Sequence, residues 1–290
     1  MRVIEAFDRP VQALAVSADG RLLAAAADDG GLAVWDWADG RLLWWVRRPS
    51  PLVQIDFAPD GSWLAACGGG VLNLFRAQDG EAIRSVGRSV GGVAYAPDGK
   101  HLVASEGRSG GDRHGRLHRW TVPDLRAVTG FDYWPPFTRL AFSPDGQYLA
   151  GINPRRFELR IAVTGGLNGW AEAFGRTASS FLSSTRDSQT FVAGWDEEFS
   201  VLDTVNGVVR RRVRSPGLPL RDAAFTGGGR HLGTADATGV LRLWDAEGWA
   251  VERAYDWRCG PLTRVAFTAD GLAGVCGTAT GRLVAFDLDD

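Results

Sequence analysis

Arginine and tryptophan side chains recur in the segments that separate the apolar runs of this 290-residue chain. Both residue types are enriched at protein interfaces, because they combine a large contact area with directional hydrogen bonds. Several of these segments also contain proline, which lowers the entropic cost of ordering a loop on binding. We therefore expect a protein or peptide partner to bind at ten positions: Arg47, Arg48, Arg108, Arg113, Trp134, Arg155, Arg156, Arg214, Trp257 and Arg258.

Two insertions form the most basic sector of the sequence. Residues 106–115 and residues 153–156 occupy equivalent places in two consecutive repeats. Guanidinium groups bind carboxylates and phosphates through paired hydrogen bonds, so an acidic peptide or a phosphate-bearing ligand could dock there. The alternative is a glycine-rich loop whose charges serve solubility. The arginines concerned are Arg108, Arg113, Arg155 and Arg156.

Groups that could perform catalysis are scarce. His114 and His118 form an isolated H-x-x-x-H pattern, but we expect the first in a loop and the second in a strand. No cysteine or carboxylate cluster accompanies them to complete a zinc site. The sequence also lacks a phosphate-binding P-loop, a nucleophile elbow and an H-E-x-x-H motif. We therefore predict no catalytic residue, no metal site and no cofactor.

The composition excludes several other classes of protein. The formal net charge is -2, so the chain has no general attraction for nucleic acid or for an anionic membrane. No apolar stretch approaches the roughly 20 residues that a spanning helix needs. The first residues lack a signal-peptide hydrophobic run, and three cysteines favour reduced thiols. We expect a cytoplasmic monomer that binds neither membrane nor nucleic acid.

One short phrase, an apolar residue followed three positions later by Asp-Gly, recurs along the chain. Its turn positions are 19, 60, 98, 145 and 270, and weaker copies stand at 187 and 228. The copies lie about 41 residues apart, which is the period expected of a repeat protein. The chain therefore consists of seven similar units.

Each unit contains four apolar or alternating runs, which we call a, b, c and d in chain order. The turns between them place glycine next to Asp or Asn, which supplies the positive φ that tight hairpins require. The runs lack the apolar spacing of three to four residues that a helix would show. The pattern therefore predicts that each unit forms a sheet of four antiparallel strands.

A sheet of this kind cannot bury its faces alone, whereas seven sheets stacked around an axis cover one another. We predict an all-β fold, a single seven-bladed β-propeller over residues 1–290. Residues 2–10 resemble a fourth run with its outgoing loop, which the last unit lacks, so we expect the N-terminal strand to pair into the last blade and remove two open edges. The expected blades are about 10–46, 51–86, 90–130, 136–174, 178–213, 219–255, and 261–290 together with 1–7.

The dipeptides Trp35-Asp36 and Trp244-Asp245 end the third run of their units. On these dipeptides and the repeat, the whole chain resembles the WD40-repeat family, in the divergent Pro-Asp-Gly form common in bacteria. The resemblance implies a non-enzymatic propeller that binds proteins. The Gly-His pair of the family is absent, so we expect its Asp-His-Ser/Thr-Trp hydrogen-bond network not to form, although Thr234, Asp236 and Trp244 stand in suitable places.

The d–a and b–c loops of a propeller share one face of the disc, and the a–b and c–d turns share the other. Loops on a rigid scaffold can vary without unfolding it, so we expect the partner on the d–a/b–c face. One alternative is an acidic or phosphate-bearing ligand bound by the arginine-rich loops. Another is an enzyme with its site at the mouth of the central channel, near the starts of the inner strands. The polar residues there are Gln12, Gln54, Thr138, Arg221, Asp222, Thr263 and Arg264.

Overall fold

A computed structural model describes residues 1–107, 115–134, 137–153, 158–163, 170–174, 181–215 and 219–288. Strands are the only regular elements in these ranges. In the first half of the chain they are β1 Arg2–Glu5, β2 Val11–Val16, β3 Leu22–Ala27, β4 Gly31–Asp36, β5 Leu42–Arg47, β6 Gln54–Phe57, β7 Trp63–Gly68, β8 Gly70–Arg76, β9 Ala82–Tyr95, β10 His101–Glu106, β11 Gly115–Thr121, β12 Ala127–Trp134 and β13 Arg139–Phe142. In the second half they are β14 Tyr148–Asn153, β15 Glu158–Val163, β16 Trp170–Phe174, β17 Phe181–Ser184, β18 Thr190–Trp195, β19 Glu198–Asp203, β20 Val209–Arg214, β21 Leu220–Phe225, β22 His231–Asp236, β23 Val240–Asp245, β24 Val251–Asp256, β25 Leu262–Phe267, β26 Ala273–Thr278 and β27 Arg282–Asp287.

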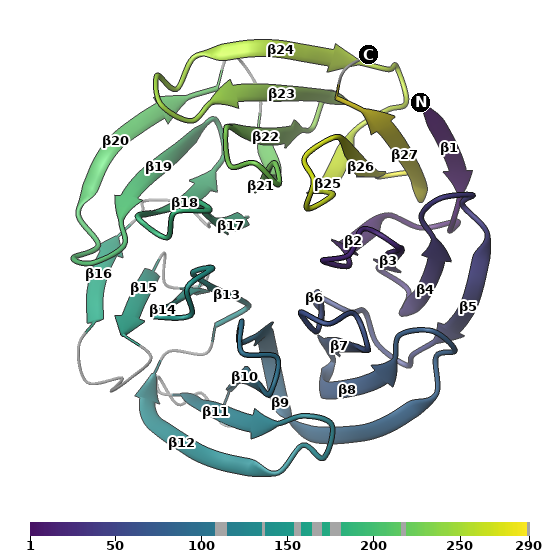
Figure 1. The fold of residues 1–290 in the computed structure, drawn as a ribbon, viewed down its shortest axis with the longest axis vertical. Coiled ribbons are helices and arrows are strands. Elements are labelled where there is room, and N and C mark those ends of the chain that lie inside the picture. The colour runs from purple at the N-terminus through teal and green to yellow at the C-terminus, as the bar shows by residue number, and fades with distance from the viewer. Residues whose placement is uncertain are drawn as a thin grey trace.

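These strands form antiparallel sheets that are arranged around a common axis (Figure 1). Four sheets consist of four consecutive strands each: β2–β5, β13–β16, β17–β20 and β21–β24. The first strand of each lies nearest the axis and the fourth lies outermost. The all-β class and the four-stranded antiparallel unit predicted from the sequence are confirmed.

One longer sheet joins two units. Strands β6 to β12 form a single seven-stranded sheet, because the 14-residue strand β9 is the outer strand of one unit and the inner strand of the next. We expected a connecting loop at Arg88 and Ser89, and this was wrong. Strand β9 continues through that point, although its register shifts beside Gly70 and Ser89 takes a positive φ of 54°.

The first and last strands of the chain pair with each other. Strand β1 lies antiparallel to β27, with Ile4 opposite Leu283, and completes the sheet β1-β27-β26-β25. In Figure 1 the two ends of the chain accordingly lie on the same side of the ring. Ile4 packs against an apolar cluster that includes Trp35 of β4 and Val275 of β26, so this cluster joins the first sheet to the last one.

The repeated Asp-Gly phrase has a local hydrogen-bonding reason. In the first copy the Ser17 hydroxyl donates to Asp19 Oδ1 at 2.6 Å and accepts the Leu22 N–H at 2.9 Å. Gly20 takes a φ of 69°, which the turn requires and which costs glycine little. The same bonds recur from Ser143, Thr185 and Thr268, so most a–b turns share one geometry.

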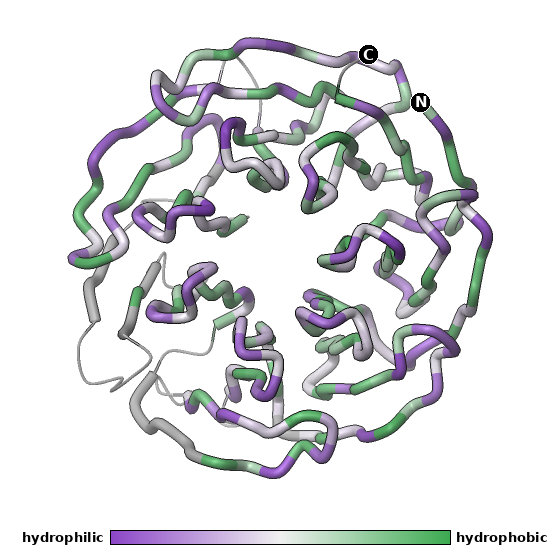
Figure 2. Tube along the Cα trace, in the orientation of Figure 1, coloured by the Kyte–Doolittle hydropathy of each residue, from purple (hydrophilic) through white to green (hydrophobic). Residues whose placement is uncertain are grey.

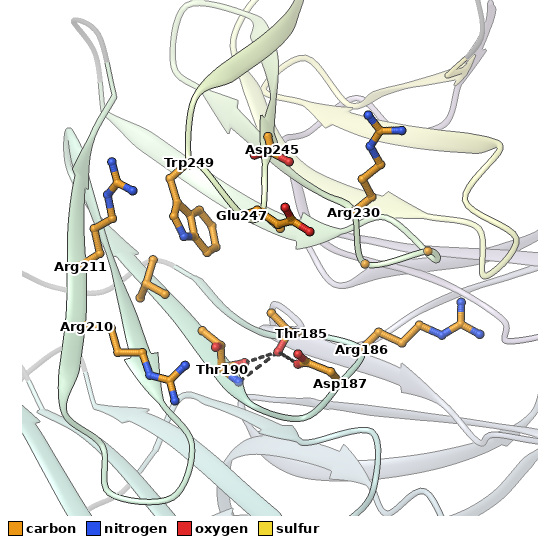
Figure 3. A pocket seen from close by; sticks show the side chains of 14 residues that line it. Thr185, Arg186, Asp187, Thr190, Arg210, Arg211, Arg230, Asp245, Glu247 and Trp249 are labelled. Atoms are coloured by element: carbon orange, nitrogen blue, oxygen red, sulfur yellow. Dashed lines mark hydrogen bonds between the residues drawn. The ribbon is translucent and has the colours of Figure 1, made fainter.

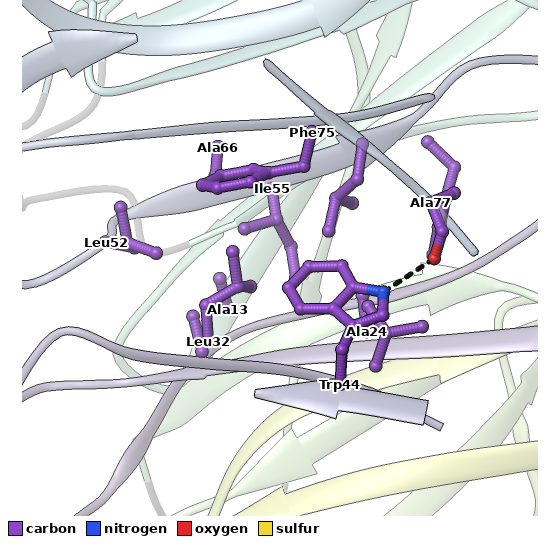
Figure 4. Close-up of a cluster of buried hydrophobic side chains, with 13 residues drawn as sticks. Ala13, Ala24, Leu32, Trp44, Leu52, Ile55, Ala66, Phe75 and Ala77 are labelled. Atoms are coloured by element: carbon purple, nitrogen blue, oxygen red, sulfur yellow. Dashed lines mark hydrogen bonds between the residues drawn. The ribbon is translucent and has the colours of Figure 1, made fainter. Parts of the chain in front are cut away.

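The apolar clusters lie between sheets that are neighbours along the chain. Figure 4 shows one of them, in which Trp44 of β5 packs against Phe75 of β8 with ring centroids 5.8 Å apart. The indole Nε1 of Trp44 donates to the Ala77 carbonyl at 2.7 Å, so burial leaves this donor satisfied. Hydrophobic and hydrophilic stretches alternate along the strands all around the ring (Figure 2).

The hydrogen-bond network that we expected to be absent is present in part. Trp244 Nε1 donates to Thr234 Oγ1 at 2.9 Å in a buried position. Asp236 accepts from Thr238 and pairs with the Arg242 guanidinium. The tryptophan half of the network therefore survives without histidine.

The pairing of β1 with β27 gives a matched test. Ile4 and Val3 are adjacent in one strand, but Ile4 packs into the cluster whereas Val3 is 46% exposed. An aspartate in place of Ile4 would put a charge against an apolar surface, so Ile4→Asp should lower the free energy of unfolding by about 2 kcal/mol. Val3→Asp should change it by less than about 0.5 kcal/mol. Urea denaturation of both variants measures the difference, and equal effects would contradict the packing of β1.

Candidate functional site

The d–a loops and b–c turns meet on one face of the ring. The Arg48 N–H donates to the Gly30 carbonyl at 2.8 Å, and the Phe7 N–H donates to the Gly281 carbonyl at 3.0 Å. A third bond of this kind, at 2.6 Å, joins Ser215 to Glu197. The two sets of loops therefore brace each other, and this face could present side chains from several sheets together.

Two of the predicted arginines on this face are engaged within the protein. Arg47 forms an ion pair with Asp29, which lowers the charge that it offers to a partner. Arg48 donates to Asn73 Oδ1 at 2.8 Å and lies 6.0 Å from the centre of the Phe75 ring. Arg48 is half-buried, so it links two neighbouring units in addition to any binding role.

Among the predicted residues near the C-terminus, Trp257 is engaged within the protein and two arginines are not. Trp257 stacks on Tyr255 at 5.5 Å and lies 4.7 Å from Phe286, so much of its surface is used in packing. Arg214 and Arg258 are exposed, and neither side chain makes a hydrogen bond or ion pair with the residues that the structure describes. These two arginines are the predicted residues that the fold leaves available.

The other five predicted residues stay predictions. Arg108, Arg113, Arg155 and Arg156 lie outside the described residues. Trp134 is the last residue of β12, and its side chain also lies outside the described part.

The polar residues of the inner strands are mostly engaged with backbone. Gln54 Oε1 accepts the Val93 and Leu140 N–H groups at 3.2 and 3.1 Å. Asp56 Oδ2 accepts the Tyr95 N–H at 2.8 Å. These N–H groups lie on inner strands, β9 and β13. The side chains thus satisfy backbone donors of other units, which would lack a partner at the open edge of an inner strand.

A second group of inner residues does the same on the opposite side of the ring. Asp222 Oδ2 accepts the Val265 N–H at 3.0 Å, and Arg264 donates to the carbonyls of Gln12 and Thr263 at 2.5 Å each. Burial raises the pKa of Asp222 and lowers the pKa of Arg264 to about 9. No group of three or more possible metal ligands occurs in the described ranges. The inner strands thus offer bracing residues rather than an acid–base pair.

The structure also contains a groove that the sequence did not predict. It has a volume of about 980 Å³ and lies between the β17–β20 and β21–β24 sheets, on the face of the a–b and c–d turns (Figure 3). Its walls come from the turns after β17, β21 and β23 and from strand β20. Among the residues that line it are four arginines, Arg186, Arg210, Arg211 and Arg230.

The groove escaped the sequence analysis because each unit supplies only part of it. We treated the a–b and c–d turns as alike, and the arginines of two different turns meet only in the folded chain. Two signals were nevertheless visible. One is the run Val-Arg-Arg-Arg-Val-Arg at 209–214, and the other is Trp249, which stands where three other c–d turns have glycine.

Comparisons with known proteins agree with the repeated fold. Residues 1–36 match the family model described as "WD domain, G-beta repeat". An uncharacterized WD repeat-containing protein of Synechocystis is 31% identical over 153 residues, which is 51% of this chain and 43% of the relative. Autophagy-related protein 18 of Meyerozyma guilliermondii is 33% identical over 88 residues, 29% of this chain and 16% of the relative. The aligned parts thus span less than half the length of these relatives.

The repeated antiparallel sheets and these matches define a protein built from propeller-type repeats. The chain is thus similar to WD40-repeat proteins, in line with the resemblance seen in the sequence. Proteins with such repeats generally mediate protein–protein interactions. The described residues include no helix of the length and apolarity that crossing a membrane takes.

The buried carboxyl of Asp56 predicts a pH dependence of stability. Burial raises the pKa of Asp56 to about 7, above the value of about 3.9 in an unfolded chain. The folded state therefore binds the proton more tightly, and stability falls as the pH rises from about 4 through 7. Asp56→Asn keeps an acceptor for the Tyr95 N–H but cannot ionise. The wild type should therefore lose about 3 kcal/mol of its free energy of unfolding between pH 4.5 and pH 7.5, and the Asp56→Asn variant should not show this loss.

Urea denaturation at several pH values measures this effect. Asp60→Asn is the control, because hydrogen bonds from Ser62 lower the pKa of that exposed carboxyl. Asp60→Asn should therefore leave the fall in the free energy of unfolding with rising pH unchanged. Parallel profiles for the wild type and Asp56→Asn would show that Asp56 is ionised in the folded protein without cost.

Proposed function

We propose that the chain is a non-enzymatic scaffold that holds a protein or peptide partner on its d–a/b–c loop face. In this proposal residues 1–290 form one domain, a monomeric and cytoplasmic seven-bladed propeller closed by strand β1. The rigid disc fixes loops from several blades, and the partner contacts them together.

Seven blades are supported by the distribution of the apolar clusters. Within the described ranges each cluster joins two consecutive units, and one joins the sheet of β25–β27 to that of β2–β5. The seven-stranded sheet counts as two blades that share β9. An open arrangement would leave two sheets with an uncovered apolar face, and the cluster around Trp35 and Val275 covers both.

The binding face is supported chiefly by the two unpaired arginines. Arg214 ends strand β20 and Arg258 follows strand β24, so the two lie at the ends of consecutive units, and both are exposed. An arginine without an internal partner can give its donors to a carboxylate or a carbonyl of another protein. Arg258 also has a positive φ of 53°, an uncommon conformation that its loop holds in place.

The inner strands support a non-enzymatic role. Gln54, Asp56, Asp222 and Arg264 hold backbone groups of neighbouring sheets. A catalytic acid or base must reach a substrate, whereas these side chains are engaged with backbone groups of the protein itself.

Charge reversal on this face tests the proposal. The double variant Arg214→Glu/Arg258→Glu should lose a partner that the wild-type protein retains from the native cell extract, by about tenfold or more in captured amount. Quantitative mass spectrometry of the captured proteins measures the loss.

The matched control is Arg84→Glu/Arg126→Glu, which makes the same charge change at exposed positions of β9 and of a c–d turn. It should retain the partner. Thermal unfolding checks that all three proteins are folded. If the first variant captures the same proteins in the same amounts as the control, the partner does not bind on the d–a/b–c face.

A further inference from the structure

The groove between the β17–β20 and β21–β24 sheets lies on the face opposite the proposed partner site, and it has a distinct character. Its floor is partly apolar: the half-buried indole of Trp249 packs edge-on against Phe199 at 5.7 Å and Phe225 at 6.4 Å. In Figure 3 Arg211 lies beside Trp249, while Arg186 and Arg230 extend along the other side. The groove thus combines an aromatic surface with guanidinium groups around it.

Two of these guanidinium groups have no partner within the protein. Arg211 and Arg230 are exposed, and neither side chain makes a hydrogen bond or ion pair in the described part of the chain. Arg186 donates to the Gly227 carbonyl at 2.8 Å, which holds its charge over the groove without neutralising it. Arg210 differs, because it pairs with Asp203.

The carboxylates of the groove are mostly tied to their own turns. Asp187 accepts the Thr185 hydroxyl at 2.6 Å, and Asp245 accepts the Gly248 N–H at 2.6 Å. Glu247 is exposed and makes no such bond in the described ranges. In the turn after β21, Gly228 stands where six other units have the aspartate of the repeated phrase. That side of the groove has therefore lost a negative charge, and Arg230 is left unpaired.

Trp249 stands at a turn position that glycine takes in three other c–d turns. Its N–H donates to the Asp245 carbonyl, as the Gly40, Gly80 and Gly207 N–H groups do in their turns. Trp249 has a φ of 57°, a left-handed conformation that glycine adopts freely and that strains a bulky side chain. Leu125 takes the same left-handed position in its own c–d turn and is buried in the core. Trp249 likewise packs against the core, and its ring also lines the groove.

We propose that this groove binds an extended acidic segment of a partner protein, with an apolar side chain against Trp249 and carboxylates on Arg211 and Arg230. The argument rests on local charge complementarity: Arg211 and Arg230 lack an internal partner and flank an apolar surface. The lining as a whole carries four arginines against the three carboxylates Asp187, Asp245 and Glu247. The volume of about 980 Å³ accommodates several residues of such a segment. The site is independent of the d–a/b–c face, and either proposal can fail alone.

Binding of a defined peptide tests the site. The probe is a fluorescein-labelled peptide of ten residues in which glutamates flank a central leucine, and fluorescence anisotropy measures its affinity. The double variant Arg211→Ala/Arg230→Ala should bind it about tenfold more weakly than the wild type. Glu247→Gln should bind it more tightly, since a repulsive carboxylate is removed.

The matched control is Arg84→Ala/Arg126→Ala, which removes two exposed arginines at other places and should leave the affinity unchanged. A peptide with glutamine in place of every glutamate should not bind. Equal loss in the groove and control variants would mean that net charge alone attracts the peptide, and the proposal would be wrong. Vesicles of phosphatidylcholine with phosphatidylserine provide a further arm. Binding to the vesicles that depends on Arg211 and Arg230, without binding to the peptide, would assign the groove to lipid and overturn the proposal.

Discussion

A sheet that is apolar on both faces must be covered on both sides, and this constraint organises the whole molecule. Strand β3 shows it within six residues. Leu23 and Ala25 belong to the cluster shared with the last sheet, whereas Ala24 and Ala26 belong to the cluster shared with the next sheet. Because side chains of a strand alternate between faces, one strand contributes to two cores. Each sheet is therefore stable only between two neighbours, and a ring supplies neighbours for all of them.

The same geometry directs the innermost strands toward a common axis and gives each of them an edge without a strand partner. The structure resolves this with side chains. Gln54 and Asp56 reach the backbone of β9, and Asp222 reaches that of β25. The polar groups nearest the axis are consequently committed to holding the ring together. Surfaces for recognition are then found on the loop faces and between blades, where side chains do not have to bind the backbone of the inner strands.

The sequence predicted the parts of the fold that depend on local chemistry. The Asp-Gly phrase encodes a turn through bonds within five residues, as at Ser17 and Leu22, and so it could be found without a structure. The pairing of Ile4 with Leu283 was visible because the last unit lacks a fourth run. The all-β class and the repeat follow from such signals.

The candidate sites were harder to predict because they depend on contacts between units. Arg48 looked like a surface residue, but Asn73 and Phe75 of the next unit engage it. Trp257 looked exposed beside its glycine, yet Tyr255 and Phe286 cover much of it. Composition and spacing describe one unit at a time, so they cannot show which arginine the neighbouring unit pairs.

The groove illustrates how a repeat protein can acquire a binding surface without altering its scaffold. In most units the a–b turn carries an aspartate and the c–d turn a glycine, and both choices satisfy the turn itself. The sixth unit departs from both rules: Gly228 replaces the aspartate, and Trp249 occupies the left-handed position. The turn hydrogen bonds are kept, because the Thr226 and Asp245 carbonyls still accept them at 2.7 and 2.8 Å. Trp249 also packs against Phe199 and Phe225, so it contributes to the core between two units as well as to the groove. Arg211 and Arg230 lack an internal partner beside this ring, and a ligand with carboxylate groups and an apolar side chain would make use of both features.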